Sequence, residues 1–182
     1  MSLRTNSPGE KSRARTTNSE TKLSSNPELT IRLDTQRESP KLSCIDMFIG
    51  DEGAIILSKY LSENTNFEYL EIRGNNISAV GFSAICDGLR GARRIKSISA
   101  EWNQIGSDPS GLIALNELIR TKSTIVSLDL RNNHIGYNSA GSISNIIKEC
   151  ETLQNLDLRW NDLGDDGAKI ILAALRTCQR KI

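Results

Sequence analysis

The sequence has few of the residues that build metal, redox or catalytic centres. It contains one histidine and four cysteines, and no two cysteines stand in a CxxC spacing. Zinc sites and dithiol redox motifs need closely spaced ligands or thiols of this kind. Phosphate-binding loops and nucleophile elbows are missing as well. We therefore expect no metal site, no bound cofactor, no small-molecule substrate and no catalytic residue.

Long hydrophobic runs are also absent. No apolar stretch approaches the roughly 20 residues that span a bilayer, and the N-terminal segment lacks the apolar core of a signal peptide. We expect a soluble, cytoplasmic protein without membrane contact. The formal net charge is +1; residues 1–27 contain five Arg or Lys and two Asp or Glu, which leaves −2 for the remainder. The body of the chain is therefore not expected to bind nucleic acid.

Residues 1–28 and 29–182 differ in composition. The first segment is dominated by Ser, Thr, Asn and basic residues, with little to bury, and is predicted to be a disordered basic tail. Its KSRAR stretch has three interpretations: a solvated tail, a contact with an acidic partner, or a segment regulated by phosphorylation of its neighbouring Ser and Thr. Residues 29–182 form the predicted folded domain. Residues 29–35 alternate in hydrophobicity, which suggests an edge strand that caps its first unit.

One short pattern recurs five times in this domain. Its clearest copy, LQNLDLRWNDLGDDGAKIILAAL at 153–175, has alternating leucines, then an asparagine turn, then apolar residues at helical spacing. The equivalent strand positions are 28, 28, 30 and 28 residues apart, which indicates five repeats of 28–30 residues; they are Leu42, Leu70, Ile98, Leu128 and Leu156. The two extra residues fall at 107–110, where a surface loop tolerates an insertion.

The repeated unit has the form LxLxxNxIxxxGA and resembles the ribonuclease-inhibitor-like leucine-rich repeats. Stacked strands lie about 4.8 Å apart, whereas stacked helices need about 10 Å. We therefore expect an α/β solenoid arc with a parallel sheet on its concave face and helices on its convex face. The resemblance implies that the turn asparagines form a ladder of buried hydrogen bonds: Asn75, Asn103, Asn133 and Asn161. Met47 replaces the asparagine in the first copy, as suits an end position.

Each of the five predicted helices turns an apolar stripe toward the core. The stripes are Ala54, Leu57 and Leu61; Phe82, Ile85 and Leu89; Leu112, Leu115 and Ile119; Ala140, Ile143 and Ile147; and Ala168, Ile171 and Leu175. Asp51, Ser78 and Asp165 are candidate N-caps. Cys44 and Cys86 are expected in the core. Cys150 and Cys178 lie on stacked helices about 8 to 10 Å apart, too far for a disulfide, which needs Cα atoms within about 7 Å.

The candidate partner site consists of side chains that the strands point into the concave face. Acidic residues form one column, arginines and Glu101 a second, and tryptophans edge the turns. The candidate residues are Glu71, Arg73, Glu101, Trp102, Asp129, Arg131, Asp157, Arg159 and Trp160. Arg and Trp are favoured at binding hot spots. An alternative stays open: the columns neutralise each other across neighbouring strands, and the tryptophans pack on their own turns.

No catalytic constellation accompanies these columns. His134 lies in a turn at a variable position, where a surface side chain is expected because the repeat places no nucleophile beside it. Asp165 and Asp166 form an acidic pair at the start of the last helix, which helix capping and the helix dipole explain. We therefore expect a non-enzymatic module that binds a protein partner.

ISAEWNQI, LDLRNNHI and LDLRWNDL, in this order and with a longer loop after the first, look like the N-terminal repeats of the centrosome-linker leucine-rich-repeat proteins. This resemblance implies a scaffold component of the cytoskeleton, centrosome, basal body or cilium, in which the repeats precede a coiled coil. The 182 residues contain no heptad region. Either the chain is a fragment or a partner covers its last repeat, so self-association stays open. The alternative function is regulation of a small GTPase, since GTPase-activating proteins with similar repeats are known.

Overall fold

The computed structural model describes residues 26–121 and 124–178. The expected tail, residues 1–28, lies almost wholly outside them. The described α-helices and strands are α1 Pro27–Thr35, β1 Lys41–Ser43, α2 Gly50–Glu63, β2 Tyr69–Glu71, α3 Ala79–Gly88, β3 Ser97–Ser99, α4 Ser110–Thr121, β4 Ser127–Asp129, α5 Ala140–Glu149, β5 Asn155–Asp157 and α6 Gly164–Thr177. Short 3₁₀ turns follow α3 and precede α4 and α5: η1 Leu89–Gly91, η2 Ile105–Ser107 and η3 Tyr137–Ser139.

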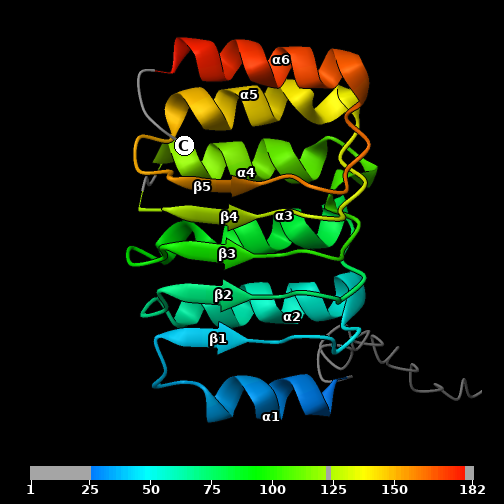
Figure 1. Cartoon of the computed structure of the whole chain (residues 1–182). Helices are drawn as coiled ribbons and strands as arrows, with labels where there is room; N and C mark the ends of the chain where they lie inside the picture. Colours follow the sequence, from blue (N-terminus) through cyan, green and yellow to red (C-terminus); the bar gives the residue numbers. More distant parts are fainter. Residues whose placement is uncertain (1–25, 122–123, 179–182) are drawn as a thin grey trace, which may run out of the picture.

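The strands form one parallel sheet in sequence order, β1 to β5 (Figure 1). Its register pairs Leu42 with Leu70, Leu70 with Ile98, Ile98 with Leu128, and Leu128 with Leu156. These are the pairs that the repeat spacing predicts, including the longer third step. The sequence-based prediction of five stacked strand–helix units is therefore confirmed.

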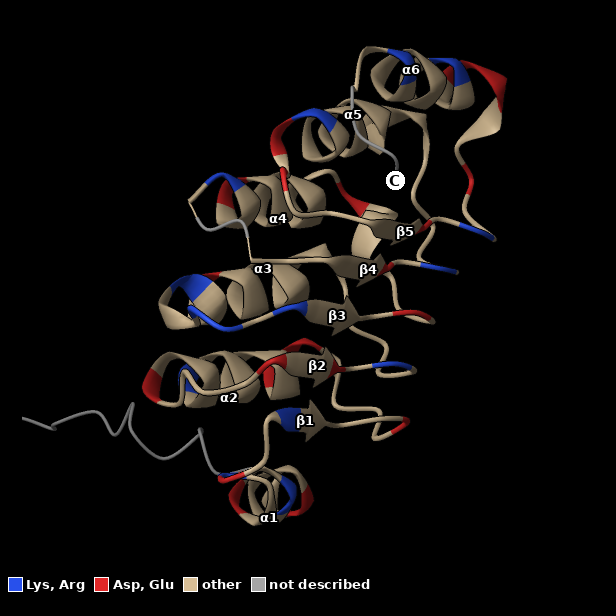
Figure 2. Cartoon of the chain, turned by 60° about the vertical axis from the view of Figure 1, so that its left-hand side comes forward, with Lys and Arg blue, Asp and Glu red and all other residues tan. Residues whose placement is uncertain are grey.

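Helices α2 to α6 cover one face of the sheet, and no described helix covers the other (Figure 2). The predicted stripes of α2 to α5 are buried between the helices and the sheet, so those four predictions are confirmed. All of these side chains except Ala140 belong to one continuous core that runs the length of the stack. The result is the predicted α/β arc, in which the free sheet face is available for contacts.

The N-terminal end of the stack differs from the prediction. Residues 29–35 are not an edge strand but part of α1, which lies beside β1 (Figure 1). The Asn26 side chain accepts a hydrogen bond from the Leu29 N–H, and Leu29 and Leu33 are buried one helical turn apart. The Gln36 side-chain amide bonds both the N–H and the C=O of Ser43 in β1. The Gln36 side chain, directly after α1, thus satisfies the hydrogen-bonding groups of the Ser43 backbone at the edge of the sheet.

The asparagine ladder is confirmed and runs from each repeat to the one before it. Asn103 Oδ1 accepts from the N–H groups of Asn75 and Ile77 at 3.1 and 3.0 Å. Asn161 Oδ1 accepts from the Asn133 and Ile135 N–H groups at 2.9 and 3.0 Å. Each asparagine therefore serves the turn of the preceding unit. An asparagine at position 47 would have no preceding strand–turn unit to serve, since α1 precedes it.

The helix N-termini confirm one of the three predicted caps. Ser78 caps α3 by accepting from the Val80 N–H. Asp51 and Asp165 lie inside the first turns of α2 and α6, so their prediction as N-caps is wrong. Asp51 instead accepts from the Ser78 N–H at 2.8 Å, the Ser78 hydroxyl at 2.6 Å and the Gly81 N–H at 3.2 Å. It stabilises the N-terminus of the next helix rather than its own.

Helix α6 departs from the predicted stripe. Ile171 is almost fully buried, but Ala168 is exposed and Leu175 is 40% exposed, so the prediction is wrong for those two. Leu172 is also exposed, whereas Cys86, at the equivalent place in α3, is fully buried. The reason is that α6 packs on α5 on one side and has no described helix on the other.

None of the four cysteines, which all lie in the described part of the chain, forms a disulfide bond. Cys44, Cys86 and Cys150 are buried, and Cys178 is half-buried, with its Sγ 3.7 Å from the Ile147 carbonyl oxygen. Burial raises the pKa of the Cys44 thiol to about 11. A thiol of this kind is protonated at neutral pH and behaves as a small hydrophobic side chain.

Candidate functional site

The two predicted columns lie where the short strands run into their turns. Register places Glu71, Ser99, Asp129 and Asp157 side by side. The backbone pairing continues past the strands: the Gly74 N–H donates to the Glu101 carbonyl, and the Trp102 N–H to the Arg131 carbonyl. The second column lies two residues further along each repeat. Backbone hydrogen bonds between neighbouring repeats therefore fix its position as they fix that of the first column.

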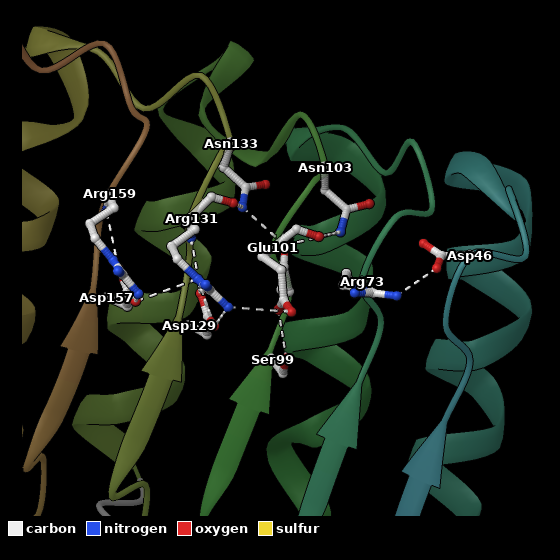
Figure 3. Close-up of polar contacts among 11 residues, drawn as sticks. Asp46, Arg73, Ser99, Glu101, Asn103, Asp129, Arg131, Asn133, Asp157 and Arg159 are labelled. Atoms are coloured by element: carbon white, nitrogen blue, oxygen red, sulfur yellow. Dashed lines mark hydrogen bonds and ion pairs between the residues drawn. The ribbon is translucent and has the colours of Figure 1, made fainter.

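Arg131 is the centre of the ion network (Figure 3). Its Nη2 lies 2.6 Å from Asp129 Oδ2 and 3.7 Å from Glu101 Oε1, and its Nε lies 3.4 Å from Asp157 Oδ2. Glu101 is buried and accepts a 2.6 Å hydrogen bond from the Ser99 hydroxyl. The hydrogen bonds to Asp129 raise the pKa of Arg131. Three strands are thus joined by one guanidinium group.

The other two arginines of the second column also form ion pairs, and Arg159 shares Asp157 with the Arg131 network. Arg159 Nη2 contacts Asp157 Oδ2 at 2.6 Å, and Arg73 Nη2 contacts Asp46 Oδ2 at 2.7 Å (Figure 3). Hydrogen bonds from Arg159 lower the pKa of the Asp157 carboxyl. At the first strand, Glu71 pairs with a lysine of β1 at 2.7 Å. The alternative stated for these columns, mutual neutralisation across strands, therefore describes much of this face.

The side chains of the two columns differ in how far they are exposed to solvent. The Arg131 side chain is 26% exposed, whereas that of Arg159 is 66% exposed. The carboxylates of Asp129 and Asp157 are as shielded as Arg131. Arg131 and its carboxylates thus form a fixed structural support, and Arg159 is the guanidinium group at this end that a partner can reach.

Trp102 and Trp160 are, together with Arg159, the exposed members of the nine candidates. They are 54% and 64% exposed, and their ring centroids lie 6.2 Å apart although they belong to the third and fifth repeats. The Arg159 guanidinium lies 5.8 Å from the centroid of the Trp160 ring. The structure therefore brings the two tryptophans and Arg159 together beside the ion network.

Both tryptophans have an uncommon backbone conformation. Their φ angles are +59°, in the left-handed region that is costly for a large side chain. The equivalent position in the other repeats is occupied by Asp46, Gly74 and Asn132, which all have positive φ. Those residue types tolerate this conformation. The left-handed conformation of the tryptophans could have been predicted from the sequence, because a repeat position that is Asp, Gly or Asn in the other copies is typical of a left-handed turn.

Phe48 is a surface residue that the sequence analysis missed. It follows the Met47 turn position, has a φ of +52° and is 79% exposed. Phe48 and Trp102 line the same shallow groove, of about 360 Å³, together with Asn76, Gln104, Asn132 and His134. We call Phe48, Trp102 and Trp160 the aromatic rim. It follows the turn edge of the sheet.

His134 lies in an exposed turn, as predicted. Its Nδ1 is 3.4 Å from Asp162 Oδ2, and both side chains are well exposed. Across residues 26–121 and 124–178, no three His, Cys, Asp or Glu side chains are grouped closely enough to hold a metal ion. The exposed side chains at the strand ends include aromatic rings, amides and charged groups.

The comparisons with known proteins agree with this geometry. A model of the leucine-rich repeat family matches residues 63–86, 121–144 and 149–171. The chain contains leucine-rich repeats and has their fold. Leucine-rich repeat-containing protein 45 of Gallus gallus is 32% identical over 103 residues, which are 57% of this chain and 15% of that protein. The chain thus matches a small part of the length of this relative.

Two solved structures have the same fold as this leucine-rich-repeat protein. The actin-binding site 2 structure of leiomodin-1 has a TM-score of 0.63 and 17% identity, covering 83% of this chain and 89% of the other. The tropomodulin C-terminal domain of Caenorhabditis elegans has a TM-score of 0.61 and 14% identity, covering 82% and 92%. At these identities the likeness shows the fold alone.

The helices of the described part are also informative about membranes. None of them combines the length and the apolar composition that a membrane crossing requires. The longest, α2 and α6, have 14 residues each, well short of the roughly 20 that a bilayer needs.

Proposed function

We propose that this leucine-rich-repeat protein is a non-enzymatic interaction module that binds a protein partner through the concave face of its sheet and the aromatic rim. The observation that supports this most is the exposure of Trp102 and Trp160 in a left-handed backbone conformation. Backbone conformations of this kind cost about 1 to 3 kcal/mol and cluster at functional sites. Packing does not account for two large side chains that are more than half exposed.

The charged columns contribute a rigid support for this surface. Arg131 and its three carboxylates lock adjacent strands together, so the turns that hold the tryptophans keep their relative positions. Arg159 adds an exposed guanidinium beside Trp160. Tryptophan and arginine are enriched among residues that dominate binding energy, and rigid presentation lowers the entropic cost of association.

The finer proposal concerns the biological setting. We propose a scaffold role at the cytoskeleton, centrosome, basal body or cilium, based on the resemblance of the last three repeats to those of the centrosome-linker proteins. The actin binding named for the leiomodin structure does not enter this proposal, because a structural likeness at 17% identity concerns the fold alone. Regulation of a small GTPase remains the alternative, without a structural feature that favours it.

Quantitative affinity purification from cells tests the proposal. The variant is the double substitution Trp102→Gly and Trp160→Asn, which introduces residue types found at the same turn position in other repeats. The control is Lys169→Glu on α6, whose side chain is 73% exposed on the helical side. We expect specific partners to be lost with the first and retained with the second.

Equal capture by the double variant and the wild type would exclude the rim as the binding surface. A GTP-hydrolysis assay with candidate small GTPases tests the alternative: acceleration by the purified protein would favour regulation of a GTPase over a scaffold role. We expect no acceleration, because the scaffold role that we propose involves no catalysis.

A further inference from the structure

The side chains that line the groove between Phe48 and Trp102 limit the kind of segment that can bind there. It is shallow, it runs along the turn edge, and its walls are aromatic faces and amides, with the Asp46 carboxylate and the His134 imidazole also among its lining groups. Such a surface offers no deep apolar pocket for a helix or a buried side chain. It suits an extended segment that lies across several repeats.

Two amide side chains of the groove, those of Asn76 and Asn132, have N–H donors that no described residue accepts. Gln104 Nε2 donates to Asn76 Oδ1, which leaves the Asn76 amide donors without an acceptor among the described residues. The Asn132 side chain likewise makes no hydrogen bond within the described part of the chain, although its backbone N–H donates to the Arg159 carbonyl. Surplus donors favour a ligand whose backbone offers carbonyl acceptors.

A polyproline helix is a ligand of this kind. It has no internal hydrogen bonds, its carbonyls are solvated, and proline has no N–H that would need an acceptor. Its rings pack on exposed aromatic faces, which is the basis of proline-rich peptide recognition elsewhere. Its preformed conformation also lowers the entropy lost on binding.

The charges at the two ends of the rim indicate what flanks such a segment. Asp162 lies two residues after Trp160, is exposed and contacts the His134 imidazole. Asp46 lies two residues before Phe48 and shares its charge with Arg73. Both ends of the rim thus present a carboxylate that can pair with a basic residue of the ligand. The exposed Arg159 guanidinium beside Trp160 offsets part of the negative charge at that end, so the basic residue there is expected beside Asp162.

We propose that the aromatic rim binds a proline-rich segment of a protein partner, flanked by basic residues. The inference rests on the proposed function, since it names the partner chemistry of the same surface. Trp102 and Trp160 stack on the proline rings, the amides of Asn76 and Asn132 donate to the segment's carbonyls, and Phe48 closes the far side of the groove.

Intrinsic fluorescence tests this directly, because the chain contains two tryptophans and both belong to the rim. The probe is a synthetic peptide of ten prolines with an arginine at each end. The control peptide has the same arginines and a glycine–serine interior. We expect a saturable change in tryptophan emission with the proline peptide, and at least tenfold weaker binding of the control peptide.

Two variants place the binding site without removing the reporters. Phe48→Ala should weaken binding of the proline peptide at least tenfold, and Phe48 is exposed enough that the fold should tolerate its loss. Ile113→Ala, at an exposed apolar position on α4, should bind as the wild type does. Trp102→Gly, monitored through Trp160, is a second variant expected to lose binding.

The proposal is overturned if no saturable change occurs, if both peptides bind equally, or if Phe48→Ala binds as tightly as the wild type. These outcomes are distinct from a failure of the proposed function. If the proline peptide does not bind but cellular partners are still lost with the rim double variant, the interaction surface stands and the proline-rich assignment falls.

Discussion

The substitution Asn133→Leu tests the buried hydrogen-bond ladder that holds the turns in place. Asn133 is fully buried; its Oδ1 accepts from the Ile105 N–H at 3.3 Å, and its Nδ2 donates to the carbonyls of Ala100 and Arg131 at 2.9 and 3.0 Å. The Ala100 carbonyl keeps a second donor in Asn103. The Arg131 carbonyl keeps the backbone N–H of the third-repeat turn.

The Ile105 N–H is therefore the buried group that loses the acceptor it uses. One orphaned buried donor costs about 1 to 3 kcal/mol, and we expect Asn133→Leu to lower the free energy of unfolding by that amount. Chemical denaturation followed by circular dichroism measures it. The matched control is Asn138→Leu, the same change at an exposed position, where about 0.5 kcal/mol or less is expected. Equal midpoints for Asn133→Leu and the wild type would refute the ladder as a stabilising element.

Three further predictions follow from close packing, the ion network and the rim. Gly88→Ala should destabilise the protein by about 1 to 3 kcal/mol, because a Cβ there would clash with the Ser58 carbonyl oxygen. Gly141→Ala is the control: a Cβ there would have no atom within 4 Å, so thermal denaturation should show a neutral or stabilising effect. Asp157 has a lowered pKa, so its stabilising effect is present above the ordinary aspartate pKa and is lost as the pH falls through the folded-state value. In denaturation at a series of pH values, Asp157→Asn should therefore be less stable than the wild type at pH 7, and the gap should close below about pH 4; a gap independent of pH would contradict this. Trp102→Asn should change the free energy of unfolding by about 1 kcal/mol or less, because relief of a left-handed conformation offsets the lost aromatic pair; a loss above about 3 kcal/mol would mark Trp102 as a core packing residue.

The repeat spacing predicts the sheet order and register because one apolar position recurs in every unit and must occupy the same place in the core. The capping helix α1 is different. Asn26 and Pro27 are a helix start signal, and Leu29 and Leu33 are one turn apart. The same residues also alternate as a strand would. Only contacts with β1, including those of Gln36, decide between the two.

The sequence names the candidate site residues other than Phe48, and their role in binding stays a prediction, but it does not give their arrangement. The columns of charge follow from the register, so the sequence places Asp157 beside Asp129. It does not determine that Arg131 bridges three carboxylates while Arg159 stays exposed, because long side chains have several rotamers and the pairing depends on all of them together. The close approach of the tryptophans across an intervening repeat has the same origin.

The candidate partner surface remains a prediction that one measurement addresses most directly. Once a partner has been captured and purified, amide hydrogen exchange of the leucine-rich-repeat protein is compared with and without it. We predict increased protection at residues 46–49, 101–104 and 159–162, which form the rim turns, and unchanged exchange in α2 to α5. Protection confined to those helices, with unchanged exchange in the rim turns, would contradict the central claim that the strand ends of this protein bind its partner.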